Sequence, residues 1–230
     1  MLPRVKSGIP GLDKKLGGGI PENSTIVLYG PPKSGKSTFA MQFIYAGLLE
    51  EEPGLFITTS VSIKRLKQEM LSLNIPISGF EEKDLINYID MFSIRSGKLL
   101  QDTDILSNIM PGSLTNLMVS VSKSFRRLAV KSPRIRTVFD SLSSILDNNP
   151  INFSPFLQTL LAKCEMANST TLLVYTEGVA DKQTKAKILS YVDGAIYLDG
   201  KGTLIVESLI GTPSPIKAKY TITDKGIAVS

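Results

Sequence analysis

Short, largely apolar runs alternate along the chain with longer stretches in which apolar residues recur every three or four positions. The runs are rich in β-branched and aromatic residues, which is typical of strands covered on both faces. The predicted strands are TIVLYG (25–30), LFITTS (55–60), LINYID (85–90), RTVFDS (136–141) and TTLLVYTE (170–177). The predicted helices span about residues 36–49, 63–73, 113–131, 154–167 and 183–191. This alternation predicts an α/β fold with a mostly parallel central sheet flanked by helices.

The C-terminal part of the chain has a different pattern. GAIYLDGKGTLIVESLIG (194–211) predicts two strands around an Asp-Gly-Lys-Gly turn, and KAKYTITDKGIAV (217–229) repeats this scheme with a second glycine-containing turn. Such turns join antiparallel strands. We therefore expect the parallel core to end in a C-terminal antiparallel meander. Since no linker or repeat interrupts the pattern, we expect residues 1–230 to form a single domain.

Composition excludes several kinds of chemistry. The sequence contains no histidine, which excludes imidazole catalysis and histidine metal sites, and its single cysteine, Cys164, cannot form an intramolecular disulfide. The apolar helical pattern around Cys164 predicts that it packs in the core. The net charge of +5 permits an acidic or nucleic-acid partner without requiring one. We see neither a signal peptide nor a run long enough to span a membrane, and expect a cytoplasmic protein.

The stretch YGPPKSGKSTF (29–39) contains the G-x-x-x-x-G-K-[ST] pattern of a phosphate-binding loop, between a predicted strand and a predicted helix. Glycines let the backbone turn so that successive N–H groups face the phosphates, and the helix N-terminus adds positive charge. We expect Lys36, exposed in the loop, to bridge the β- and γ-phosphates and the Ser37 hydroxyl to ligate Mg²⁺. The predicted nucleotide-binding residues are Gly30, Pro31, Pro32, Lys33, Ser34, Gly35, Lys36, Ser37 and Thr38. No Asn-Lys-x-Asp stretch reads guanine, so the predicted nucleotide is ATP or ADP.

Asp140 supplies the second carboxylate that such a site requires. It ends the apolar run RTVFD, a position from which phosphate-loop proteins support magnesium. The predicted Mg²⁺ ligands are therefore Ser37 and Asp140. The alternative is that Asp140 caps the helix that begins at SLSSIL, and the two roles are compatible.

The segment SGIPGLDKKLGGGIPENSTIVLYGPPKSGKSTFAMQFIYAGL (7–48) closely resembles the KaiC and RadA branch of the RecA-type ATPases. Later segments agree with this resemblance, namely FITTS (56–60), FDSLS (139–143), YVDGAIYL (191–198) and TDKGIAV (223–229). The resemblance implies a RecA-like fold in which ATP lies between neighbouring subunits. It therefore also implies a homo-oligomer, or assembly with a partner protein.

The resemblance further implies two catalytic features that this sequence lacks. In the family, a pair of glutamates follows the second strand, and one of them polarises the attacking water. A Lys-x-Arg pair on a late strand reaches the γ-phosphate of the neighbouring subunit. Ser60 and Val61 occupy the glutamate positions here, and Ser208 and Ile210 occupy those of the lysine and arginine. The absence of either pair of side chains predicts slow hydrolysis of ATP.

Other residues are candidates to replace these groups. Glu177 ends TTLLVYTE and is the candidate general base, although strand-end glutamates are often simply solvated. Lys217 and Lys219 are candidates for the missing cation, but their alternation in IKAKY equally fits a solvent-facing strand row.

Two basic segments are candidate surfaces for nucleic acid, which RecA relatives bind. No acidic residue occurs from Ile105 to Phe139. That segment contains Lys123, Arg126, Arg127, Lys131, Arg134 and Arg136, with Lys123, Arg127 and Lys131 spaced to share one helix face. The loop GVADKQTKAK carries Lys182, Lys185 and Lys187. Aromatic residues suited to stacking are absent apart from Phe125, whose spacing predicts core, so a solvated face or a protein contact is favoured.

The sequence thus predicts an ATP-binding protein of RecA fold that resembles KaiC domains. Nucleotide would act mainly as a structural or assembly ligand, and the protein would be at most a slow ATPase. The main alternative is an active DNA-stimulated ATPase of the recombination-mediator (RadA-paralogue) type. A small phosphate-loop kinase is disfavoured by the antiparallel C-terminal meander and by the lack of an arginine-rich lid.

Overall fold

The computed structural model describes residues 2–95, 114–178 and 182–230. Its strands are β1 (Arg4–Val5), β2 (Ile20–Pro21), β3 (Thr25–Gly30), β4 (Gly54–Thr58), β5 (Ile86–Asp90), β6 (Ile135–Asp140), β7 (Ser169–Thr176), β8 (Gly194–Leu198), β9 (Thr203–Leu209), β10 (Ile216–Thr223) and β11 (Gly226–Val229). Its helices are α1 (Leu12–Lys15), α2 (Lys36–Leu49), α3 (Ile63–Ser72), α4 (Ser78–Glu82), α5 (Met91–Arg95), α6 (Leu114–Ala129), α7 (Leu142–Asn148), α8 (Phe153–Met166) and α9 (Lys182–Ser190).

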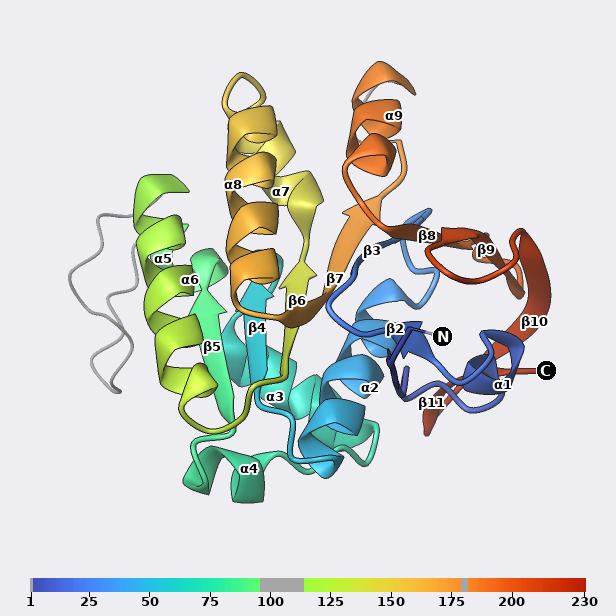
Figure 1. Cartoon of the computed structure of the whole chain (residues 1–230), viewed down its shortest axis with the longest axis horizontal. Coiled ribbons are helices and arrows are strands. Elements are labelled where there is room, and N and C mark those ends of the chain that lie inside the picture. Colours follow the sequence, from blue (N-terminus) through green and yellow to red (C-terminus); the bar gives the residue numbers. More distant parts are fainter. Residues whose placement is uncertain (1, 96–113, 179–181) are drawn as a thin grey trace.

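The main sheet has nine strands within the described residues, in the order β11-β10-β9-β8-β3-β7-β6-β4-β5 (Figure 1). The strands from β8 to β5 pair in parallel, whereas β9, β10 and β11 pair antiparallel. Asp199 shapes the turn between β8 and β9, because its carboxylate accepts hydrogen bonds from the amides of Lys201 (2.7 Å) and Thr203 (2.8 Å). The predicted α/β fold, with a parallel core and a C-terminal antiparallel meander, is confirmed.

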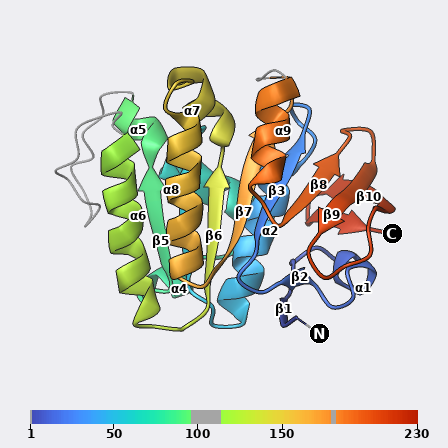
Figure 2. The ribbon, with the colours of Figure 1, turned by 45° about the horizontal axis from the view of Figure 1, so that its top comes forward.

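Helices cover both faces of the parallel sheet, which explains why its strands are apolar throughout (Figure 2). In β3, Ile26 and Leu28 pack in a core cluster with α2 and α3. Val27 and Tyr29 point to the other face, into a cluster formed with α6, α7 and α8. Cys164 and Phe125 are buried in this second cluster, as predicted.

Several boundaries differ from the predicted ones. β4 ends at Thr58 because the Thr58 hydroxyl donates a 2.6 Å hydrogen bond to the carbonyl oxygen of Val61 and closes a turn there. Ser62 then caps α3, with its hydroxyl accepting from the amide of Arg65 (3.3 Å). The β1–β2 ladder and the helices α1, α4 and α5 were not predicted, since elements of two to five residues carry too little periodicity.

Arg136 does not belong to a basic surface, so the prediction that grouped it with the neighbouring cations was wrong. Its side chain is fully buried in β6, with Nε 2.7 Å from the carboxylate of Glu52. Its Nη1 donates to the carbonyl oxygens of Lys6 (2.6 Å) and Phe43 (2.9 Å). The guanidinium thus ties the N-terminal segment, α2 and β6 together inside the protein.

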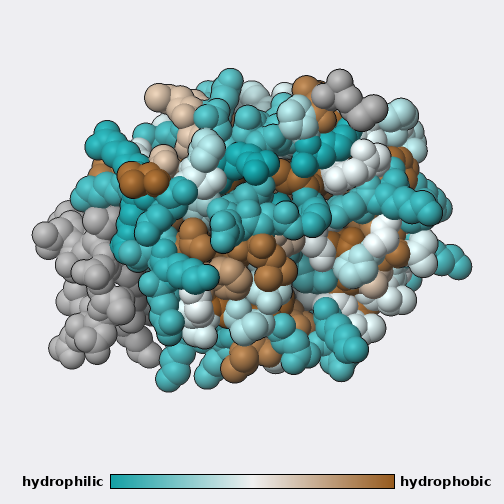
Figure 3. Space-filling view, turned by 60° about the horizontal axis from the view of Figure 1, so that its bottom comes forward, coloured by the Kyte–Doolittle hydropathy of each residue, from teal (hydrophilic) through white to brown (hydrophobic). Residues whose placement is uncertain are grey.

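The outer surface is mixed in character. Figure 3 shows the lower side of the view in Figure 1, where hydrophilic side chains predominate and apolar ones form small separate groups. Among the described helices, none combines the length and apolarity needed to cross a bilayer.

Candidate nucleotide-binding site

The loop of residues 30–35 joins β3 to α2 and requires glycine at both ends. Gly30 has φ 153°, and a Cβ there would lie 2.0 Å from the carbonyl oxygen of Leu198. Gly35 has φ 96°, in the left-handed region, and immediately precedes α2. The two glycines therefore allow the tight turn that the phosphate-loop pattern predicted, and Gly30 also allows the close approach of β8.

The backbone N–H groups from the second half of this loop to the first turn of α2 lack hydrogen-bond acceptors in the part of the chain that the structure describes. Within the described residues, no hydrogen bond is donated by the backbone N–H groups of residues 33–38. Unpaired donors are expected in the first turn of any helix, and here they continue into the loop that precedes α2. Together with the positive end of the helix dipole, these donors suit phosphate oxygens.

Lys36 is buried at 6% exposure, so the expectation of an exposed lysine was wrong. Its ammonium donates hydrogen bonds to the carbonyl oxygens of Gly30 (3.0 Å) and Pro31 (2.6 Å) and to Oγ of Ser34 (3.3 Å). Burial lowers the pKa of Lys36, while the negative charges of Asp140 and Glu177 act to raise it. The loop carbonyls thus solvate the ammonium in place of water.

Ser37 and Asp140 lie together, as the prediction of a shared role requires. Strand pairing places Asp140, at the end of β6, beside Thr58 of β4. Burial raises the pKa of Asp140, whereas a hydrogen bond with Ser37 and the charge of Lys36 lower it, and the charge of Glu69 adds to the rise. Glu69 on α3 was not considered in the sequence analysis, because its proximity depends on how α3 packs.

The capping alternative for Asp140 finds no support. The residue that caps α7 is Ser141, and no side chain makes a capping hydrogen bond there. Among the described residues, no group of three or more His, Cys, Asp or Glu side chains is placed to hold a metal ion. A Mg²⁺ ion at Ser37 and Asp140 would therefore take its other ligands from phosphate and water, as Mg²⁺ commonly does.

Glu177 lies beside the phosphate loop but is paired. Its amide donates a 2.9 Å hydrogen bond to the carbonyl oxygen of Gly30. Its carboxylate lies 2.9 Å from Nζ of Lys185, and that ammonium also sits 4.3 Å over the ring of Tyr29. Lys185 therefore belongs to this ion pair, and it lies on α9, in agreement with the helix predicted over about residues 183–191.

Comparison with known proteins identifies the family of this chain. The family model described as "ATPase: KaiC" matches residues 5–230. The chain belongs to the KaiC ATPase family. It is 29% identical over 238 residues to a UPF0273 protein of Pyrococcus furiosus, covering 100% of this chain and 94% of that protein. A UPF0273 protein of Thermotoga maritima is 28% identical over 238 residues, covering 100% and 96%. The crystal structure of a KaiC-like protein from Pyrococcus horikoshii superimposes with a TM-score of 0.78 at 26% identity, covering 100% of both chains.

Ser60 and Val61, which the resemblance predicts at the glutamate positions, present no carboxylate. Ser60 is exposed in the turn after β4. Val61 is half-buried and packs against the core cluster of α2 and α3. A serine hydroxyl cannot act as the missing anion, and valine has no polar side-chain atom.

Ser208 and Ile210, which the resemblance predicts at the Lys-x-Arg positions, lie level with the start of β3, away from this chain's own phosphate loop. In the register of the sheet, Leu209 pairs with Gly194, which in turn pairs with Ile26 near the start of β3. The loop leaves β3 at its other end. Ser208 and Ile210 flank Leu209 and are exposed, so they cannot contact the phosphate loop of the same chain.

Strand β10 contributes a contact to the loop that the sequence did not reveal. Lys217 and Lys219 are exposed and alternate with the buried residues Ala218 and Tyr220, in agreement with a solvent-facing strand row. On the buried side, the hydroxyl of Tyr220 donates a 2.9 Å hydrogen bond to the carbonyl oxygen of Ser34.

The predicted basic surfaces are only partly realised. Lys123 and Arg126 are exposed on α6, whereas Arg127 pairs with Asp84. Lys131 lies beyond the end of α6, so the predicted helix face of three cations was wrong, and its ammonium donates to the carbonyl oxygen of Lys83 (3.3 Å). On α9, Lys182 and Lys187 are exposed.

Proposed function

We propose that this KaiC-family protein binds Mg·ATP in the loop of residues 30–38 and hydrolyses it slowly at most. Nucleotide would then act mainly as a structural or assembly ligand. The observation that carries the binding half of this proposal is the row of unpartnered amides at residues 33–38, which includes the first turn of α2. A phosphate chain would give these donors the acceptors they lack.

Three side chains would then contact the bound nucleotide or its metal ion. The Lys36 ammonium would exchange the carbonyl oxygens of Gly30 and Pro31 for phosphate oxygens. Ser37 and Asp140 would hold Mg²⁺, which supplies charge neutralisation at the β- and γ-phosphates. The buried carboxylate of Asp140 would gain a cationic partner in this way.

The proposal of slow hydrolysis rests on the residues at the positions where a general base would activate water. A positioned general base contributes about 10² to 10⁴ in rate. Ser60 and Val61 cannot fill that role, and the carboxylate of Glu177 is engaged by Lys185. We therefore propose that bound ATP persists rather than being consumed.

Bound ATP that is not hydrolysed would stabilise whichever state of the protein binds it, including an oligomer. A ligand that binds only the folded or assembled state stabilises it by about 2.7 kcal/mol at a hundredfold excess over Kd. If ATP lies between subunits, as in relatives of the RecA type, this free energy favours the oligomer.

Calorimetric titration with Mg·ATP, alongside steady-state turnover with and without single-stranded DNA, tests the proposal. We expect saturable binding to wild type and a loss of at least about tenfold in affinity for Lys36→Ala, because charge-assisted hydrogen bonds disappear. The matched control is Lys15→Ala, which removes an exposed lysine of α1, outside the loop, and should retain affinity.

Unchanged binding by Lys36→Ala would refute the site. Turnover of about 1 s⁻¹ or faster would refute the holding role, since that is the ordinary enzyme range. Strong stimulation of turnover by DNA would favour the recombination-mediator type of ATPase.

A further inference from the structure

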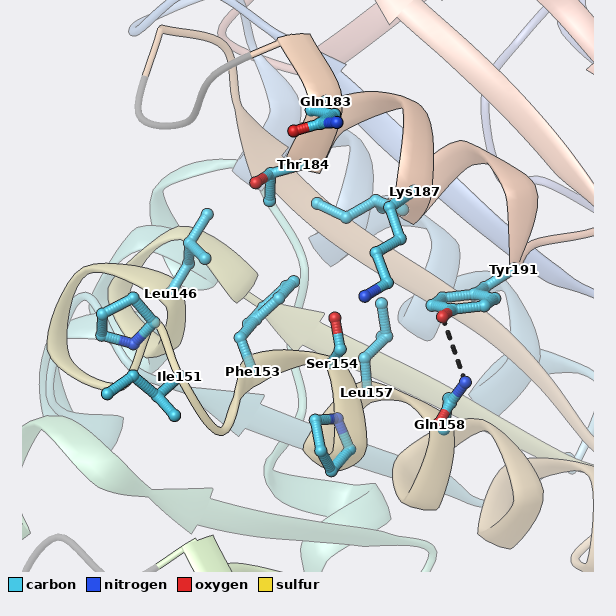
Figure 4. A pocket seen from close by; sticks show the side chains of 13 residues that line it. Leu146, Ile151, Phe153, Ser154, Leu157, Gln158, Gln183, Thr184, Lys187 and Tyr191 are labelled. Atoms are coloured by element: carbon cyan, nitrogen blue, oxygen red, sulfur yellow. Dashed lines mark hydrogen bonds between the residues drawn. The ribbon is translucent and has the colours of Figure 1, made fainter.

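A groove of about 840 Å³ lies between α9 and the turn that joins α7 to α8 (Figure 4). Its floor is formed by the apolar side chains of Leu146, Phe153, Leu157 and Ile188. Ile151 stands on its rim with 91% of its surface exposed, next to Pro150. A concave site with an apolar floor and this volume falls in the range that holds small organic ligands. None of residues 30–38 lines it, so it is separate from the phosphate loop.

Six of the thirteen lining residues are polar: Ser154 and Gln158 on α8, Gln183, Thr184 and Lys187 on α9, and Tyr191 directly after α9. Lys187 extends from α9 and turns its amino group over the groove, between Phe153 and Tyr191 in the view of Figure 4. The hydroxyl of Tyr191 accepts a 3.1 Å hydrogen bond from the side-chain amide of Gln158. Ser154 adds a hydroxyl near the start of α8.

The residues that line the groove carry positive charge only. No aspartate or glutamate is among its lining residues, and Lys187 has no ion-pair partner among the residues that the structure describes. Lys185, two positions earlier on the same helix, is by contrast paired with Glu177. A cation above an apolar floor is complementary to a molecule with one anionic group and an apolar body.

We propose that this groove binds an amphipathic organic anion, with its apolar body on Phe153, Leu157 and Ile151 and its anionic group on Lys187. The shape is preformed, because the floor residues are themselves buried in the core of the sheet. Gln158 and Tyr191 would orient a second polar group of the ligand.

The probe is anilinonaphthalene sulfonate, an aromatic body with one sulfonate, whose fluorescence rises on transfer to an apolar site. Its uncharged analogue, N-phenylnaphthylamine, keeps the aromatic body without the anion. We expect saturable binding of the sulfonate at one site per chain. Its affinity should fall at least about tenfold in Lys187→Glu, the size expected for loss of a charge-assisted contact. Ile151→Asp should also weaken binding, and both changes are at exposed positions that leave the core intact.

The matched control is Lys182→Glu, an exposed lysine of the same helix that does not line the groove, and it should bind as wild type does. The proposal is overturned if Lys187→Glu binds the sulfonate as wild type does, if binding does not saturate, or if the uncharged analogue binds equally well. It is also overturned if sedimentation shows that a second copy of the chain occupies the groove and excludes the dye.

Discussion

The hydroxyl of Tyr220 donates a hydrogen bond to the carbonyl oxygen of Ser34, 2.9 Å away, and joins the C-terminal meander to the phosphate loop. Tyr220 is 5% exposed and Ser34 is 1% exposed, so the contact is made away from water. Burial raises the pKa of Tyr220, which keeps the hydroxyl protonated as a donor. The antiparallel strands added to the parallel sheet thus support the loop directly.

Tyr220→Phe should destabilise the protein by about 1 kcal/mol, because the variant leaves the buried carbonyl of Ser34 without its partner. Urea denaturation without nucleotide measures this loss. Thr221→Ala, on the exposed side of the same strand, is the control and should unfold like wild type. An unchanged midpoint for Tyr220→Phe would show that the hydrogen bond contributes nothing.

Restoring carboxylates at the family positions should accelerate turnover. Ser60→Glu combined with Val61→Glu should raise the rate by about tenfold, below the 10² to 10⁴ range of general-base catalysis because Ser208 and Ile210 still occupy the positions of the trans cations. Phosphate release at saturating Mg·ATP measures the effect.

The control for this change is the matched pair Ser60→Gln and Val61→Gln, which has the same size without the charge. Since Val61 packs against the core, Ser60→Glu alone separates an effect on catalysis from one on folding. Equal rates for the Glu and Gln pairs would mean that absence of a carboxylate does not limit turnover.

Asp140→Asn should have opposite effects on the stability of the ligand-free protein and on its Mg²⁺-dependent binding of ATP. Burial raises the pKa of Asp140 above its value in the unfolded chain, so the ionised carboxylate opposes folding, and stability falls as the pH rises above about 3.8. The ligand-free Asn variant should therefore be more stable than wild type at neutral pH and should lose the part of ATP binding that depends on Mg²⁺. Thermal unfolding with ATP in Mg²⁺ or EDTA measures both effects, and Asp147→Asn, at an exposed position, is the control. A less stable ligand-free Asn variant would contradict this interpretation.

The buried pair of Glu52 and Arg136 should be a major determinant of stability. Glu52→Gln leaves the guanidinium of Arg136 without its counter-charge at 1% exposure, and such a loss costs about 3–5 kcal/mol. Glu50→Gln breaks the exposed pair with Lys6 and should leave the urea midpoint nearly unchanged. Similar midpoints for the two variants would show that the burial of Arg136 is compensated by other groups.

Local patterns were enough to predict the strand, loop and helix from Thr25 to Leu49. The periodicity of apolar residues identifies the strand and the helix, and glycine and lysine at set positions identify the loop between them. Asp140 was also predictable, because it ends an apolar strand and parallel strands end at the same edge of the sheet. By contrast, only the family resemblance indicated that Ser60 and Val61, which follow β4, occupy the glutamate positions.

Contacts between distant segments could not be predicted in this way. The hydrogen bond of Tyr220 to Ser34 spans 186 positions, and the pair of Arg136 and Glu52 spans 84. Periodicity shows that Tyr220 and Arg136 belong to strands, but it does not show which polar atom meets each of them after packing. Because the sequence did not reveal its pairing with Glu52, Arg136 was predicted to belong to the basic surface.

The sequence by itself determined the α/β class, the antiparallel C-terminal strands and the residues of the phosphate loop, because each depends on spacing along a short segment. Only the tertiary structure decided that Lys36 is buried among the loop carbonyls and that Glu177 is paired with Lys185. It also decided that the groove at α9 combines apolar side chains with a single cation. These features depend on which segments the sheet order brings together, and that order is set by packing over the whole chain rather than by any local pattern.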